Sequence, residues 1–204
     1  MKSARQEILE KLEKALHEEP AKPDFDTPVY HPIEKPLEIA FKENLEKISG
    51  SVHLFSTEKG LFENLKSFLS GFNSETILCN EKELTGKLSE FEILFTSALK
   101  LPENIKVGIT SCEFLVAHTG SVMVSSSQQG GRQMFVYPPI HIVIAKKEQI
   151  VPYLEQAYSG IQEKYRNNLP SQISIITGPS RTADIEKTLI LGAHGPKEFH
   201  VFIF

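Results

Sequence analysis

The stretch TGPSRTADIEKTLILGAHGP, near the carboxyl terminus, combines residue types that bind anions and transfer protons. Ser180 or Thr182 could cap a following helix that contains Asp184 and Glu186. A helix start with free N–H groups, next to Arg181, could hold a phosphate or a carboxylate. The two carboxylates would already satisfy the helix dipole and would repel an anion. A purely structural turn, with Arg181 paired to Asp184, is therefore the alternative.

Two histidines in glycine-containing turns are candidates for proton transfer. His194 lies between Gly192 and Gly195, and His118 lies in the turn AHTG. An imidazole titrates near neutral pH, so either side chain could act as an acid or a base. A loop histidine without a chemical role is the alternative for both. His141 opens an apolar run and is expected in the core, hydrogen-bonded to backbone.

Other chemical signatures are weaker. The loop SSSQQGGR carries hydroxyls and Arg132, which could grip a polar ligand, although a plain surface loop has the same composition. Cys112 follows an apolar run, so it is a conceivable nucleophile, but no paired base is evident. The sequence contains no GxxxxGK[ST], GxGxxG or GxSxG motif. Histidines, cysteines and carboxylates are not closely spaced, so no transition-metal site is expected.

Strands and helices must position these residues. Short apolar runs, typical of strands buried between helix layers, recur along the chain. They cover residues 51–56, 75–79, 92–96, 106–110, 121–125, 141–145, 173–177 and 199–204. Apolar residues at helical spacing predict helices. These helices cover residues 3–19, 37–50, 61–71 and 150–161.

This alternation predicts an α/β fold with three layers around a mostly parallel sheet. Residues 1–36, a helix followed by PAKPDFDTPVYHPIEKP with five prolines, are predicted to form an N-terminal arm. Residues 37–204 are predicted to form the α/β domain, with a charged, loop-rich stretch at 80–105. Open α/β sheets bind ligands beyond the carboxyl ends of their strands. The loops that follow residues 110, 125 and 177 and the loop before the last strand are therefore expected to converge on one cleft.

Composition limits the function classes. The chain has 204 residues, of which 40% are hydrophobic and 24% charged, and a net charge of -4, so it lacks the basic character of a nucleic-acid-binding domain. Its two cysteines, Cys79 and Cys112, are too few for a disulfide scaffold or a four-cysteine iron–sulfur cluster. The charged amino terminus and the lack of a run of about 18 apolar residues predict a cytoplasmic protein without membrane insertion.

Three longer runs resemble the LUD domain of the lactate utilization protein C family. They are GITSCEFLVAHTGSVMVSSS, GGRQMFVYPPIHIVIAKKEQIV and TGPSRTADIEKTLILGAHGPKEFHVFIF. The resemblance, over about residues 106–204, implies a fold similar to the NagB/RpiA/CoA-transferase-like group and a role in bacterial oxidation of L-lactate to pyruvate. It also implies partner proteins that carry iron–sulfur clusters, with none bound by this chain, and a small anionic ligand.

The resemblance also supplies candidate ligand-binding residues at the matched positions. These are Thr110, Thr119, Gly120, Arg132, Gly178, Ser180, Arg181, Thr182, Asp184, His194 and Gly195. One position departs from the family, since His118 stands where a glutamate usually precedes the TG pair. A carboxylate nucleophile at that position, which CoA transfer would use, is therefore absent.

Three functions stay open at this point. The chain could be a component of a lactate-oxidising assembly, whose cleft binds a small carboxylate or a phosphorylated cofactor and whose arm docks a partner. It could be a self-sufficient isomerase or acyl-transfer enzyme that uses His194 or His118, which is a fold-level analogy. It could also be a non-catalytic, ligand-binding regulatory subunit.

Overall fold

The computed structural model describes residues 3–15, 30–98, 100–183 and 189–204. Contacts divide the chain into two units, Met1–Pro32 and Ile33–Phe204. The first unit contains helix α1 (Ala4–Lys14), which begins at a capping box between Ser3 and Gln6 and has no buried residue. Among the described residues, no helix has the length and apolar character needed to cross a membrane.

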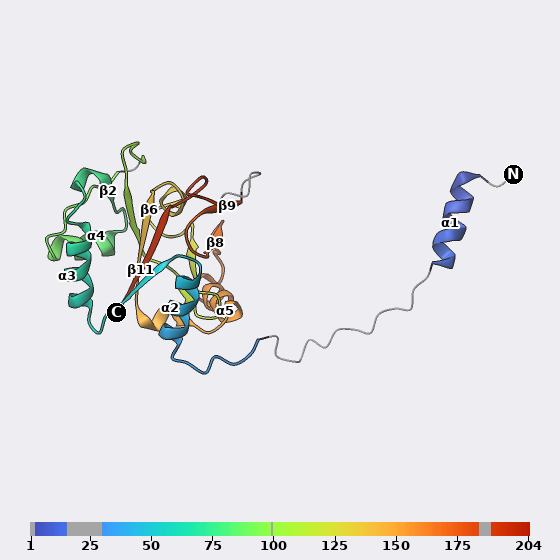
Figure 1. Ribbon diagram of the computed structural model, residues 1–204, viewed down its shortest axis with the longest axis horizontal. Coiled ribbons are helices and arrows are strands. Elements are labelled where there is room, and N and C mark those ends of the chain that lie inside the picture. Colours follow the sequence, from blue (N-terminus) through green and yellow to red (C-terminus); the bar gives the residue numbers. More distant parts are fainter. Residues whose placement is uncertain (1–2, 16–29, 99, 184–188) are drawn as a thin grey trace. The chain divides into compact units, whose positions relative to one another are not determined.

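A parallel sheet forms the centre of the second unit (Figure 1). In the described part of the chain its order is β1-β11-β6-β3-β2, and every neighbouring pair is parallel. The strands are β1 (Ser51–Leu54), β2 (Ile77–Leu78), β3 (Val107–Thr110), β6 (Ile140–Ala145) and β11 (Glu198–Ile203). The run IHIVIA occupies the middle position, where both faces are covered, which explains why it is almost continuously apolar.

A second, smaller sheet packs beside the first. Its order is β7-β4-β5-β8, with β4–β5 and β5–β8 antiparallel and β4–β7 parallel. The strands are β4 (Phe114–Val116), β5 (Ser121–Ser125), β7 (Ile150–Val151) and β8 (Ile173–Ile176). The apolar runs at 121–125 and 173–177 therefore form strands as predicted, but they belong to this sheet rather than to the parallel one. Strand β5 is buried at every position, like the parallel strands, so its apolar pattern alone could not assign it to a different sheet.

Helices cover the outer faces of the two sheets. They are α2 (Leu37–Lys47), α3 (Glu58–Leu69), α4 (Lys82–Glu90) and α5 (Leu154–Tyr165), with short 3-10 helices at η1 (Ser74–Thr76), η2 (Arg132–Phe135) and η3 (Lys147–Gln149). Helices α3 and α4 cover one face of the parallel sheet, where Leu65 packs in a cluster with Ile142 (Figure 1). Helix α2 and the small sheet share the other face, where Phe41 belongs to the cluster of Val143. Helix α5 covers the small sheet through Ile161. The predicted α/β class with a mostly parallel sheet is confirmed.

Two predicted elements are wrong, and one helix was not predicted. Residues 92–96 form no strand and contribute only a bridge between Thr96 and Leu78. The stretch predicted to be loop-rich contains α4. The helix predicted from residue 150 begins only at Leu154, since Ile150–Val151 is strand β7. Pro152 explains this start, because the residue before a proline is pushed towards extended geometry.

The predicted helix after GPSR is also wrong over its first residues. Residues Arg181–Ala183 form strand β9, which pairs in antiparallel register with β10 (Leu189–Leu191). An extended partner strand thus competes successfully with the helix that Ser180 or Thr182 was expected to cap. Asp184 and Glu186, the predicted first-turn carboxylates, lie outside the described residues.

Candidate functional site

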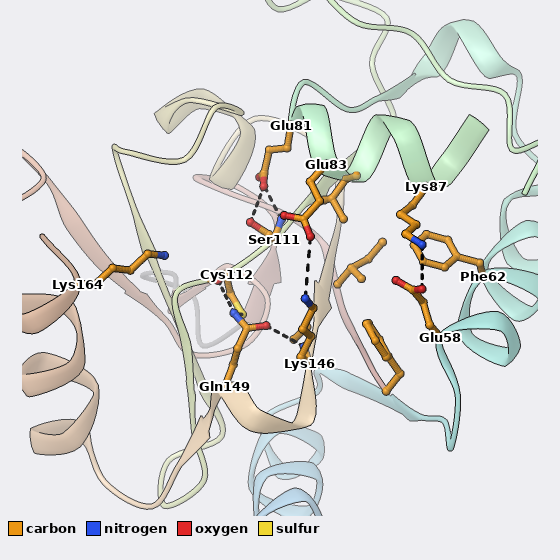
Figure 2. Close-up of a pocket in the computed structure, with 14 residues that line it drawn as sticks. Glu58, Phe62, Glu81, Glu83, Lys87, Ser111, Cys112, Lys146, Gln149 and Lys164 are labelled. Carbon is orange, nitrogen blue, oxygen red and sulfur yellow. Dashed lines mark hydrogen bonds and ion pairs between the residues drawn. The ribbon is translucent and has the colours of Figure 1, made fainter. Parts of the chain in front are cut away.

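A pocket of about 220 Å³ opens where strands β2, β3 and β6 end (Figure 2). It is lined by Glu58, Phe62, Glu81, Glu83, Leu84, Lys87, Ser111, Cys112, Ile144, Ala145, Lys146, Gln149, Lys164 and Phe204. Ser111 directly follows β3, and Lys146 directly follows β6. These are carboxyl ends of parallel strands, the usual place for ligands in open α/β sheets. We call this cavity the carboxyl-edge pocket.

Glu81 is the most deeply buried acid of the carboxyl-edge pocket, with only 7% of the residue exposed. One carboxylate oxygen, Oε1, accepts a hydrogen bond of 3.0 Å from the Ser111 backbone N–H, and Oε2 accepts one from the Ser111 hydroxyl. Burial raises the pKa of Glu81 above its usual range, because desolvation disfavours the charged form. The charges of Glu113 and Glu83 act in the same direction, whereas the Ser111 hydrogen bonds oppose it.

Two glutamine side chains fasten the loops that carry Ser111 and Lys146. Gln128, in the loop after β5, donates from Nε2 to the Ser111 carbonyl over 2.8 Å and to the Ser111 hydroxyl over 3.1 Å. Gln149 accepts from the Lys146 N–H over 2.8 Å and donates to the Cys112 carbonyl over 2.7 Å (Figure 2). The polar rim is thus held in place by side-chain hydrogen bonds between separate loops.

The lysines of the carboxyl-edge pocket differ in how firmly they are paired. Lys87 lies 3.0 Å from the Glu58 carboxylate. Lys164 lies 2.7 Å from that of Glu113. Lys146 lies 4.0 Å from the carboxylate of Glu83, whose side chain is 85% exposed. Such a long, solvent-exposed pair contributes little, so Lys146 can turn to an anionic ligand at low cost.

A second cavity of about 680 Å³ adjoins the pocket and shares Glu81, Ser111 and Lys164 with it. At its wall lies Glu113, 4% exposed, which accepts hydrogen bonds from Lys164 Nζ, Ser125 Oγ and Tyr165 Oη at 2.7, 2.6 and 2.8 Å. Burial alone would raise the pKa of Glu113, but these hydrogen bonds outweigh it and lower the pKa. Two neighbouring carboxyls therefore have pKa values shifted in opposite directions, a pattern typical of acid–base sites.

The two cysteines are poor nucleophiles in this environment. Cys79 is fully buried, and burial raises the pKa of its thiol to about 12. Cys112 is 5% exposed, and burial raises its pKa as well, helped by the charges of Glu113 and Glu81. The thiolate form that a cysteine nucleophile needs is therefore disfavoured at both positions.

Thr110 and His141 lie in the interior rather than at a surface. The Thr110 hydroxyl and the His141 Nε2 atom are 2.8 Å apart, and both residues are fully buried. Burial lowers the pKa of His141 to about 3, so the imidazole is neutral at physiological pH. His141 is a core residue, as its apolar run predicts, but its partner is a threonine hydroxyl instead of the expected backbone group.

Backbone conformation and close packing favour glycine at Gly120 and Gly178. Both have positive φ angles, of 64° and 84°. A Cβ atom on Gly120 would lie 2.3 Å from the Leu45 backbone nitrogen, and one on Gly178 would lie 3.1 Å from the Ile48 carbonyl. Thr119 lies beside Gly120 and contacts the buried Ser121 hydroxyl at 2.7 Å. The predicted residues at these turns thus pack against the carboxyl-terminal part of α2.

The Arg181 turn and the His194 turn do meet, as predicted, but away from the pocket. The Ser180 N–H donates to the Pro196 carbonyl over 2.8 Å, and Gly195 packs against the Ser180 side chain. Arg181 donates to the Ser49 hydroxyl over 2.7 Å. The His194 side chain is exposed, and Thr182 lies partly buried in β9. Asp184 lies outside the described residues.

This corner lies at the amino ends of the parallel strands. The Lys197 N–H donates to the Pro139 carbonyl, directly before β6 and β11 begin. Of the four loops expected to converge, those after β3 and β5 meet beside the carboxyl-edge pocket, where Gln128, which lines the adjoining cavity, donates to the Ser111 carbonyl. The loop after β8 and the loop before β11 meet each other at the opposite edge. The prediction of one common cleft is therefore wrong.

Arg132 and His118 lie outside the carboxyl-edge pocket. Arg132 is exposed at the start of η2 and donates to the Ser171 hydroxyl. His118 is exposed, and its ring centroid is 5.5 Å from that of Tyr153. Neither residue lines the carboxyl-edge pocket. The predicted site residues are thus distributed over several regions of the second unit.

Residues 39–204 match the family model of the LUD domain. The chain belongs to the LUD domain family. Lactate utilization protein C of Bacillus subtilis (strain 168) is 42% identical over 100 residues, which cover 48% of this chain and 42% of that protein. The protein of the same name from Geobacillus thermodenitrificans (strain NG80-2) is 40% identical over 96 residues, or 46% and 40% of the two chains. The match spans less than half the length of these relatives.

A solved structure shares the fold of this LUD domain. It is that of a DUF162 family protein from Deinococcus radiodurans, with a TM-score of 0.59 and 16% sequence identity. The similarity covers 82% of this chain and 95% of the other. The resemblance stated from the sequence motifs is thereby confirmed at the level of family and fold.

Sequence reasoning missed the buried acid that lines the carboxyl-edge pocket of this LUD domain. Glu81 comes two residues after the apolar run at 75–79, so the carboxyl-end rule, applied to that run as to the others, would have found it. Lys164 lies on α5, and no sequence signal places a helix residue of that kind at the pocket. The charged stretch around Glu81 resembles a solvated loop, which concealed a buried carboxyl.

Proposed function

We propose that this LUD domain chain is a component of a bacterial L-lactate utilization system and that its carboxyl-edge pocket binds a small carboxylate such as lactate or pyruvate. Family membership and relatives named lactate utilization protein C support the first part. The pocket supports the second part. Because the match spans less than half of those relatives, their whole activity enters here as a proposal.

The observation that carries the proposal is the position of Lys146 across the pocket from Glu81 and Ser111 (Figure 2). An ammonium group whose ion-pair partner lies 4.0 Å away can bind a carboxylate through a charge-assisted hydrogen bond. The volume of about 220 Å³ is below the ~300–1,000 Å³ of pockets for drug-sized ligands. A three-carbon acid suits such a space.

Partner proteins with iron–sulfur clusters would carry out electron transfer during lactate oxidation. The chain has two cysteines, whereas such clusters are generally held by four. Affinity purification of the full chain from its native cell tests this part. Recovery of a cysteine-rich iron–sulfur protein is expected, and its repeated absence under native expression contradicts the assembly.

Isothermal titration of L-lactate and pyruvate into the full chain tests the pocket. Lys146→Met should weaken binding about tenfold or more, the effect of losing a hydrogen bond to a charged group. Lys59→Met, which removes an exposed lysine of α3, is the matched control and should leave the affinity unchanged. Arg181→Met probes the opposite edge of the sheet. Loss of binding in that variant, with Lys146→Met unaffected, would assign the anion to the GPSR turn instead.

The residues that line the pocket also suggest tests of the two alternative functions, a self-sufficient enzyme and a regulatory subunit. A self-sufficient isomerase or acyl-transfer enzyme needs an acid or base at the ligand, and the pocket offers Glu81, whereas His194 and His118 do not line it. Turnover of a sugar phosphate or thioester that disappears in Glu81→Gln would favour such an enzyme. Ligand binding without turnover would favour a regulatory subunit.

A further inference from the structure

We infer that Ser111 and Glu81 form a proton-controlled anion receptor, in which the Ser111 hydroxyl donates to a bound carboxylate when Glu81 carries a proton. One proton would then be taken up with each anion that binds. Because this coupling concerns the ligand of the proposed function, it rests on that function. It adds the atom that contacts the anion and the pH dependence of binding.

The hydrogen bonds around Ser111 define the state in which Glu81 is ionised. A hydroxyl has one hydrogen to donate and two lone pairs that accept. An ionised carboxylate only accepts, so the Ser111 hydrogen is committed to Glu81 Oε2. One lone pair of Ser111 Oγ accepts from Gln128 Nε2 over 3.1 Å. Ser111 then has only a lone pair left for the pocket, and this repels an anion.

Protonation of Glu81 reverses the donor and the acceptor in the hydrogen bond between Ser111 Oγ and Glu81 Oε2. The carboxyl O–H can donate to Ser111 Oγ, whose two lone pairs are then used by Glu81 and Gln128. The Ser111 hydrogen is released and can point to a carboxylate in the pocket. The Ser111 backbone N–H keeps its 3.0 Å bond to Glu81 Oε1 in both states, so the loops need not move.

Gln128 fixes the direction of this exchange. Its Oε1 accepts from the Ser125 N–H over 2.8 Å, and its Nε2 donates to the Ser111 carbonyl over 2.8 Å. The oxygen and the nitrogen of the Gln128 amide therefore each have a backbone partner. Exchanging their positions would break the hydrogen bonds to the Ser125 N–H and to the Ser111 carbonyl. Gln128 thus remains a donor towards Ser111 Oγ, which leaves Glu81 as the partner that can change role.

Charges around Glu81 favour the coupled uptake. The pocket and its adjoining cavity together present acids and lysines from α3, α4, the loop after β3, the end of β6 and α5. Beside Glu81 the acids are Glu58, Glu83 and Glu113. The bases are Lys82, Lys87, Lys146 and Lys164. Among these described lining residues the charges balance when Glu81 is ionised, and one positive charge is in excess when Glu81 is protonated. The protonated state is therefore the one that attracts an anion.

Burial of Glu81 also favours its protonated form. It raises the pKa of Glu81, and the nearby charges of Glu113 and Glu83 add to the shift. The pKa of Glu113 is instead lowered by its donors, so this second acid stays ionised while Glu81 titrates. The described residues that line the two cavities include no histidine. Proton uptake coupled to anion binding would thus be assigned to Glu81.

Isothermal titration of sodium pyruvate into the full chain, in buffers with different ionisation enthalpies, measures the protons taken up per anion. At pH values above the Glu81 pKa, the wild-type chain should take up about one proton, and its affinity should fall about tenfold per pH unit. Glu81→Gln places an amide donor against Ser111 Oγ at every pH. This variant should bind pyruvate without proton uptake and without the pH slope.

Ser111→Ala provides a second variant, which keeps Glu81 but removes the donor. Its affinity at low pH should be about tenfold below that of the wild type. Pyruvate binding by the wild type without proton uptake, or an unchanged pH slope in Glu81→Gln, would overturn the receptor but leave the carboxylate site in place. Absence of pyruvate binding in the wild type and in Glu81→Gln at every pH would overturn both.

Discussion

The Ser111 N–H and hydroxyl both donate to the Glu81 carboxylate, although the two residues are thirty positions apart in the sequence. They meet because β2 and β3 pair in parallel, with Leu78 opposite Gly108, so the segments that leave both strands emerge at one edge of the sheet. The topology of the parallel sheet thereby brings a buried acid and a hydroxyl to the wall of one pocket.

Glu81→Gln should change how stability depends on pH. A carboxyl with a raised pKa binds its proton more tightly in the folded state, so the folded chain holds more protons than the unfolded chain between the two pKa values. The free energy of unfolding therefore falls as the pH rises through that window. Glu81→Gln should lack this fall and gain relative stability at higher pH. Urea unfolding at pH values from about 4 to 8 measures it, and parallel curves for the two proteins would contradict it.

Lys164→Met should destabilise the fold by about 1–2 kcal/mol at neutral pH, because the buried Glu113 loses a charged donor. The pKa of Glu113 is lowered in the folded state, so its contribution is present above the unfolded pKa and lost as the pH falls. The difference from wild type should therefore shrink in acid. Lys59→Met, from an exposed i,i+4 pair with Glu63, should cost about 0.5 kcal/mol or less. Equal effects of the two variants would contradict the role of Glu113.

Gly120→Ala should destabilise the protein by about 2 kcal/mol or more. Its φ of 64° strains an L-residue, and the new Cβ would lie 2.3 Å from the backbone nitrogen of Leu45 in α2. Gly86→Ala, inside α4 with nothing within 4 Å of the added Cβ, should stabilise by about 0.5–1 kcal/mol. Thermal unfolding of both variants checks the contrast, which a stable Gly120→Ala protein would refute.

The thiols of Cys79 and Cys112 should resist alkylation in the native protein. Both are buried, and their pKa values are raised by desolvation, to about 12 for Cys79. Iodoacetamide at about pH 8 should label neither thiol until denaturant is added, when both react. Mass spectrometry of the labelled chain reads the result. Rapid native labelling of Cys112 would show a thiolate and reopen its role as a nucleophile.

The sequence pattern predicted most of the large elements correctly. The run IHIVIA forms β6 and FHVFIF lies over β11, because runs of this length and apolar character occur where both faces of a strand are covered. Strands β4 and β7 have three and two residues and depend on their neighbours for pairing, so periodicity could not find them. Helix α4 contains Gly86 within a charged stretch, which hid its apolar positions Leu84 and Leu88.

The site was predictable only in part. The carboxyl-end rule directed attention to the loop at Ser111 and to the loop of Gln128, which the structure brings together. It could not show that β8 pairs antiparallel with β5 in the smaller sheet, so that the loops after these two strands leave at opposite ends. The turns at Gly120 and Gly178 pack closely against the end of α2 and the residue that follows it. Residue type alone does not distinguish such packing from ligand binding.

Backbone amide chemical shifts of the full chain, recorded during a pyruvate titration, test the central claim most directly. A ligand in the carboxyl-edge pocket should move the signals of Ser111, Cys112 and Gln149 most, and Lys146→Met should weaken these changes. Shifts confined to Gly178, Arg181 and Gly195 at the opposite edge of the sheet would contradict the account.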